Sequence, residues 1–244
     1  MTQYASIAKR ALAYLTLQKS EDELESTQQV IAQQSIPLIA LGLGLFYYVS
    51  AEIIIYICGG PSINAGILSA LIITLFDAYL YRGQKLAALS WTGELLQAWQ
   101  NENYEEAEIS KHYSLMLLNL GIIIKLTCIA VIVFKGQSIW LSLAPIFAAT
   151  VFSLSAPKAE LAHPEASFSA LYAWGIAALC SIPCILIAKA LPQTILALLI
   201  VAGATHFLSL SVLKAFGTIN RQLCLALTEV TFILTLLCTL VLIL

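Results

Sequence analysis

The stretch SINAGILSALIITLFDAYLY, residues 62–81, is apolar along almost its whole length and carries one charged side chain, that of Asp77. A helix of about 20 apolar residues is long enough to cross the hydrocarbon core of a bilayer. The stretch therefore predicts a membrane-spanning helix with a carboxylate about one turn from its end. The same rule predicts six further spans, at residues 36–58, 113–134, 138–154, 168–190, 194–213 and 223–244.

The composition agrees with an all-α fold, a polytopic membrane helix bundle of about seven transmembrane helices. Hydrophobic residues make up 60% of the chain and charged residues 11%, which excludes a soluble domain with a wetted surface. The net charge is −2 and no basic stripe exists, so nucleic acid is excluded as a partner. Membrane lipid is the expected surrounding of this chain.

Basic residues in the connecting segments predict the orientation, because cytoplasmic loops of membrane proteins are enriched in Lys and Arg. With the N-terminus inside, nine basic residues lie on the cytoplasmic side and two, Lys135 and Lys189, on the outer side. The nine are Lys9, Arg10, Lys19, Arg82, Lys85, Lys111, Lys158, Lys214 and Arg221. The asymmetry predicts an N-in, C-out topology, which an odd number of spans requires.

Two polar regions define the expected domain organisation. Residues 1–35 predict a cytoplasmic amphipathic segment, because apolar residues at helical spacing precede an acidic cluster. Residues 36–244 predict a single transmembrane domain. Its cytoplasmic loop at 82–112 is long enough to form a helix of its own, which we expect to lie along the membrane surface.

Five ionisable residues fall inside the predicted spans, where a charge is costly and indicates function. Lys125 either pairs with Asp77 or Glu229 and holds helices together, or takes part in binding a ligand, and both interpretations stay open. His206, alone on an apolar helix, predicts a hydrogen-bonded core residue and not a metal ligand. Glu52 lies toward the outer end of the first span, where its side chain can reach the interface.

Five segments resemble, in order and spacing, those of one membrane enzyme family. They are AYLTLQ at 13–18, SIPLIALGLGL at 35–45, YSLMLLNLGIIIKL at 113–126, LAPIFAATVFSLSAPKAELAHPEASFSAL at 143–171 and EVTFILTLL at 229–237. The chain resembles the cobalamin synthase family, adenosylcobinamide-GDP ribazoletransferase. The resemblance implies a multi-span protein of the bacterial inner membrane that uses magnesium to join α-ribazole to adenosylcobinamide-GDP, with release of GMP.

The family's chemistry lies in three acidic motifs, H-x-D-G-L-x-D-x-x-D-G, E-I-M-K-D-S-R and T-G-D. Placing the first motif on LFDAYLYRGQ, residues 75–84, puts its first aspartate on Asp77 and the next two on Tyr81 and Gln84. The second motif then falls on residues 97–101, QAWQN, and the third on residues 216–222, FGTINRQ, without an aspartate. The resemblance implies that Asp77 is a metal ligand and that the residues contributing to catalysis are Asp77, Glu165 and Glu229. In the alternative interpretation, Asp77 is a hydrated acid at the helix end that pairs with Arg82 or Lys85. The substrate contacts that it implies are Gln84, Gln97, Asn101, Lys125, His163 and Arg221.

The loss of these carboxylates bears on activity, because magnesium requires several oxygen ligands and neutral amides bring no charge. Three hypotheses remain. The chain is a diverged magnesium-dependent enzyme acting on a corrinoid nucleotide, a non-catalytic relative that binds or assembles with a membrane protein partner, or a small transporter. The missing ligands favour a cobalamin synthase-like membrane protein whose catalytic site is degenerate, with magnesium as cofactor only if the protein is active.

Overall fold

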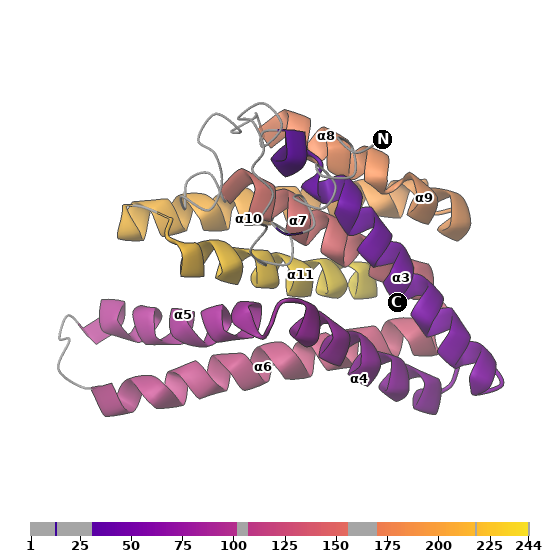
Figure 1. Cartoon of the computed structure of the whole chain (residues 1–244), viewed down its shortest axis with the longest axis horizontal. Coiled ribbons are helices and arrows are strands. Elements are labelled where there is room, and N and C mark those ends of the chain that lie inside the picture. The colour runs from indigo at the N-terminus through magenta and orange to yellow at the C-terminus, as the bar shows by residue number, and fades with distance from the viewer. Residues whose placement is uncertain (1–12, 14–30, 102–106, 156–169, 218, 244) are drawn as a thin grey trace.

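Helices make up the fold throughout the part of the chain that the computed structural model describes, which is residue 13 and residues 31–101, 107–155, 170–217 and 219–243 (Figure 1). No strand occurs in these ranges. The predicted all-α class is confirmed. The elements in chain order are α3 (Ile36–Ile57), α4 (Ile63–Leu80), α5 (Gln84–Asn101), α6 (Ala107–Phe134), η1 (Ser138–Ser142), α7 (Leu143–Ser155), α8 (Ala170–Cys180), α9 (Ile182–Ala188), α10 (Leu191–Phe216) and α11 (Arg221–Ile243).

Seven segments of the described chain are long and apolar enough to cross a membrane, in agreement with the predicted number. They are Ile31–Ile57, Ile63–Leu80, Tyr113–Phe134, Ser138–Ser155, Leu171–Ala188, Leu191–Lys214 and Arg221–Ile243. The chain is a multi-pass integral membrane protein. The fourth span begins as the 3-10 helix η1, and the fifth is interrupted at Ser181 between α8 and α9, just before Pro183.

The loop predicted at 82–112 contains a helix, α5, but its predicted place along the membrane surface is wrong. Figure 1 shows α5 lying beside α6 in the same direction as the spans. Leu89 of α5 packs over Gly121 of α6, where an added Cβ would come within 2.5 Å of the leucine side chain. The joint between α4 and α5 contains Arg82 and Gly83, whose positive φ angles of 51° and 69° interrupt the helix. Beyond this joint α5 continues in the general direction of α4, and both helices run antiparallel to α6 (Figure 1).

Helix α7 lies at the centre of the bundle. Every residue from Leu143 to Ser155 is buried except the half-buried Leu154, because α3, α8 and α11 pack around the helix. Two glycines permit close helix contacts. A Cβ at Gly44 of α3 would collide with the Ser142 carbonyl, and a Cβ at Gly66 of α4 would come within 2.5 Å of the Ala130 carbonyl oxygen of α6.

Candidate functional site

Three ionised side chains from three spans meet inside the bundle. Asp77 comes from the last turn of α4, Lys125 from the second half of α6 and Glu229 from the third turn of α11. The Lys125 ammonium donates hydrogen bonds to Asp77 Oδ2 at 2.6 Å and to Glu229 Oε1 at 2.8 Å. Their relative exposures are 3%, 1% and 0% for Asp77, Lys125 and Glu229, so bulk water does not screen the contact. We call these three residues the buried ion cluster.

Further polar groups surround the buried ion cluster on the Asp77 side. The Tyr47 hydroxyl of α3 donates to Asp77 Oδ1 at 2.8 Å. The Lys85 ammonium of α5 lies 4.0 Å from the same oxygen and 3.3 Å from the centroid of the Tyr81 ring. The second oxygen of Glu229, Oε2, is buried and has no hydrogen-bond partner among the described residues. Both oxygens of Asp77 therefore accept a hydrogen bond, whereas only one oxygen of Glu229 does so among the described residues.

The charges of this region balance. Asp77 and Glu229 contribute two negative charges, and Lys125 and Lys85 two positive ones, within a shell that includes the aromatic rings of Tyr81 and Phe232. Burial of an uncompensated charge costs several kcal/mol, so this balance is a condition of stability. Lys85 lies outside the spans, and burial lowers its pKa below that of free lysine, although the Asp77 and Glu229 carboxylates act in the opposite direction.

A second polar contact joins the start of α5 to the start of α11. Arg221 Nη2 donates to Gln84 Oε1 at 2.9 Å, and both side chains reach solvent. The Asn220 side chain accepts a hydrogen bond from the Leu223 N–H and so caps α11. Gln84 is followed directly in the chain by the buried Lys85, so this pair lies at the solvent-facing edge of the region around the buried ion cluster.

The structure brings together some of the residues that the sequence singled out. Both pairings considered for Lys125 occur at once, and Gln84 and Arg221 meet. Helix α5 includes positions 97 and 101, but the side chains of Gln97 and Asn101 lie outside the described set. His163 and Glu165 lie outside the described residues.

Two members of the site, Tyr47 and Tyr81, were not anticipated. Tyr47 lies in the apolar run FYY, where nothing marks one tyrosine as a carboxylate partner. Tyr81 was given no role of its own. Lys85, in contrast, was considered with Arg82 as a partner of Asp77, and its ammonium lies 4.0 Å from Asp77 Oδ1. It reaches Asp77 because it lies just past the Arg82-Gly83 joint, which returns the chain toward this carboxylate.

The expected place of His206 inside the core is wrong. It is exposed on the outward face of α10. Glu52 is half-buried toward the C-terminal end of α3 and, with Tyr48 and Tyr56, lines a shallow groove of about 380 Å³.

The buried ion cluster does not fit a magnesium site as far as the described residues go. Magnesium takes six oxygen ligands at about 2.0–2.1 Å in octahedral geometry. Here the space between the two carboxylates is taken by the Lys125 ammonium, and no group of three or more His, Cys, Asp or Glu side chains that could hold a metal occurs among the described residues. Asp77 is thus partnered by lysine, and no reaction step through magnesium follows from this geometry.

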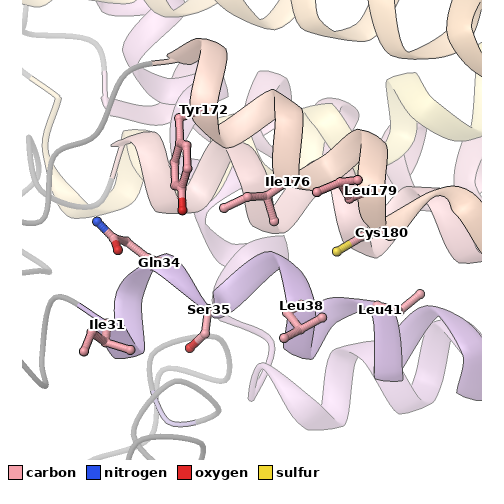
Figure 2. A pocket seen from close by; sticks show the side chains of 9 residues that line it. All are labelled: Ile31, Gln34, Ser35, Leu38, Leu41, Tyr172, Ile176, Leu179 and Cys180. Carbon is pink, nitrogen blue, oxygen red and sulfur yellow. The ribbon is translucent and has the colours of Figure 1, made fainter.

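A separate groove of about 410 Å³ lies between the first and fifth spans. Figure 2 shows Ser35, Leu38 and Leu41 opposite Ile176 and Leu179 of α8, with Gln34 and Tyr172 at one end. Its lining is mostly aliphatic and contains no residue of the buried ion cluster. The groove is therefore separate from the buried ion cluster.

No protein-family model matches this sequence, and comparison with the curated proteins and with the solved structures gives no match either.

Proposed function

We propose that this integral membrane protein is a cobalamin synthase-like, non-catalytic relative of the bacterial inner membrane that binds a corrinoid nucleotide. The observation that carries the proposal is the contact of Lys125 with Asp77 and Glu229. The resemblance assigns these residues to three segments far apart in sequence, the first acidic motif, the third span and the C-terminal span. In this register, three segments that the resemblance places far apart in the sequence supply one charged contact.

The same contact supports the non-catalytic part of the proposal. Transfer from a GDP-activated corrinoid develops negative charge on phosphate oxygens, which a metal ion must stabilise. The two buried carboxylates are already paired with one ammonium, at 2.6 and 2.8 Å. Exchanging that tethered cation for magnesium would strand a lysine charge in the protein interior, at a cost of several kcal/mol.

Binding without transfer requires groups that face the cytoplasm. Arg221 and Gln84 form such a pair, with the guanidinium suited to a phosphate or diphosphate. Lys85 adds a second positive charge behind them. We therefore place corrinoid nucleotide binding at the starts of α5 and α11, on the predicted cytoplasmic side.

The experiment uses the purified full chain in detergent with Mg²⁺, adenosylcobinamide-GDP and α-ribazole, and measures GMP release and corrinoid nucleotide binding separately. We expect no GMP above the level of an Asp77→Asn variant. We expect binding that weakens about 10- to 150-fold in Arg221→Gln, since a charge-assisted hydrogen bond contributes about 1.5–3 kcal/mol. Lys135→Gln, which removes an exposed charge on the predicted opposite side, is the matched control.

The two readouts test different parts of the proposal. GMP release above the Asp77→Asn level would show that the protein is an enzyme. Absence of both release and binding, in a folded and monodisperse protein, would overturn the family assignment.

A small transporter is the second candidate, favoured by the unpartnered Glu229 Oε2 beside an ammonium in the middle of the bundle. Intramembrane ionisable groups with unused hydrogen-bonding capacity occur along ion and proton pathways. Proteoliposomes loaded with a pH-sensitive dye test this function. Proton flux that is abolished in Glu229→Gln would favour the transporter, and its absence would exclude proton transport.

A further inference from the structure

The outward face of α10 carries a polar side chain in the middle of the membrane. The sixth span runs from Leu191 to Lys214 and is the least buried of the seven. With a rise of 1.5 Å per residue, His206 lies about 5 Å from the midpoint of that span, well inside a hydrocarbon core about 30 Å thick. His206 is exposed and has no hydrogen-bond partner among the described residues.

Lipid cannot satisfy this imidazole. Unlike lysine or arginine, histidine has no long stem with which to reach an interface about 10 Å away. A polar group left without a hydrogen bond in an apolar medium costs several kcal/mol, so histidines in spans face protein or water. The position of His206 therefore indicates that protein outside the described residues covers this face of α10.

The residues around His206 form a regular seam. Leu196, Leu199, Gly203, His206 and Leu210 are all exposed and follow one another at intervals of three, four, three and four residues. This is the spacing with which two helices pack against each other in a left-handed pair. Gly203 is the small residue of the seam, and the space around its Cβ position is open, with no atom within 4 Å. A mid-helix glycine is less stable in a helix than alanine, and no packing contact with the described residues explains its presence here.

We propose that two copies of this chain associate through α10, with this seam as the interface and the two His206 side chains hydrogen-bonded to each other. Copies inserted in the same orientation are related by a two-fold axis along the membrane normal, which places residue 206 of each at the same depth. A neutral imidazole has one N–H donor and one acceptor nitrogen, so two of them complement each other. Gly203 allows the two helices to approach closely enough for this contact.

A second copy explains the seam better than an unrelated partner does. Each copy brings the donor, the acceptor and the glycine that the other requires, so the surface is self-complementary. The flanking seam residues are leucines, which pack equally well against their own copies. This interface is independent of the buried ion cluster, whose residues lie on α4, α6 and α11.

Cysteine cross-linking in native membranes tests the geometry without altering His206. In a Cys58→Ser background, which removes the exposed native cysteine, Leu199→Cys is compared with Ile123→Cys. These positions are matched, because both side chains are about equally exposed, at 63% and 60%, and both lie near the middle of a span, on α10 and α6 respectively. On oxidation we expect a dimer from Leu199→Cys alone. Equal cross-linking from both positions, or none from Leu199→Cys, would overturn the proposal.

The role of the histidine is tested by fluorescence energy transfer between labelled copies, diluted stepwise in lipid vesicles. His206→Leu should raise the dimer dissociation constant about 3- to 20-fold, which corresponds to the range for interhelical hydrogen bonds in membranes. His206→Asn should retain most of the affinity, since an amide also donates and accepts. An unchanged dissociation constant for His206→Leu would refute the proposed contact.

Discussion

Removing the Lys125 ammonium perturbs the bundle at its most highly charged point. In Lys125→Met the side-chain volume is nearly kept, but Asp77 and Glu229 lose hydrogen bonds of 2.6 and 2.8 Å. Only Lys85, 4.0 Å from Asp77, remains to balance two carboxylates. Breaking a buried pair by removing one partner costs about 3–5 kcal/mol. Uptake of a proton by one carboxylate limits the loss, so we expect about 3 kcal/mol.

The measurement is thermal unfolding of the full chain in a mild detergent, followed by tryptophan fluorescence. For a chain of this size, about 3 kcal/mol corresponds to a fall in Tm of about 6–12 °C. Lys135→Met is the control, because Lys135 is exposed just beyond the end of α6 and its loss should leave Tm nearly unchanged.

A double variant that restores the charge balance tests whether that balance stabilises the fold. Lys125→Met combined with Glu229→Gln leaves Asp77 with Lys85 and Tyr47, one negative and one positive charge. If charge balance is what matters, the double variant should melt above the single one. A double variant that melts lower than Lys125→Met, or a single variant as stable as Lys135→Met, would show that the cluster does not stabilise the fold as argued.

Two further predictions concern packing and pH. Gly66→Ala should destabilise the bundle by about 1–3 kcal/mol in the same unfolding assay, because the added Cβ would lie 2.5 Å from the Ala130 carbonyl oxygen. Gly42→Ala, with nothing within 4 Å of the added Cβ, should leave the stability unchanged, and equal effects of the two variants would contradict the close α4–α6 contact. Burial lowers the pKa of Lys85, so between that lowered pKa and about pH 10.4 the unfolded chain binds more protons than the folded one, and stability should rise with pH. Between about pH 7 and 9.5, Tm should therefore rise less in Lys85→Met than in the unmodified protein. Identical slopes of Tm against pH in the two proteins would contradict the lowered pKa of Lys85.

Much of the fold follows from the sequence because spanning length and hydropathy are local properties. Seven spans were expected and seven are found. The place of α5 was not predictable in the same way, since Leu89 packs against Gly121 and the pairing depends on the turn at Arg82 and Gly83. A helix sequence that mixes polar and apolar residues is equally compatible with a position along the membrane surface and with packing against a neighbouring helix.

The site was predictable only in part, because pairing partners are set by helix rotation. The intramembrane positions of Lys125, Asp77 and Glu229 indicated that they would be paired or would bind a ligand, and the sequence left both options open. The participation of Tyr47 depends on which face α3 turns inward, which an evenly apolar helix does not reveal. His206 was expected in the core, but it faces outward, and its evenly apolar helix does not reveal which face turns toward the bundle.

The packing of α7 has a consequence for the biogenesis of this protein. This short helix contacts both α3, in the first of the seven described spans, and α11, in the seventh. Until α11 is inserted, α7 lacks one of its neighbours and Lys125 has only one of its two carboxylate partners. Burial of α7 and pairing of Lys125 are therefore completed in the same step, the insertion of α11. A membrane intermediate that contains the first six described spans alone would leave one face of α7 uncovered.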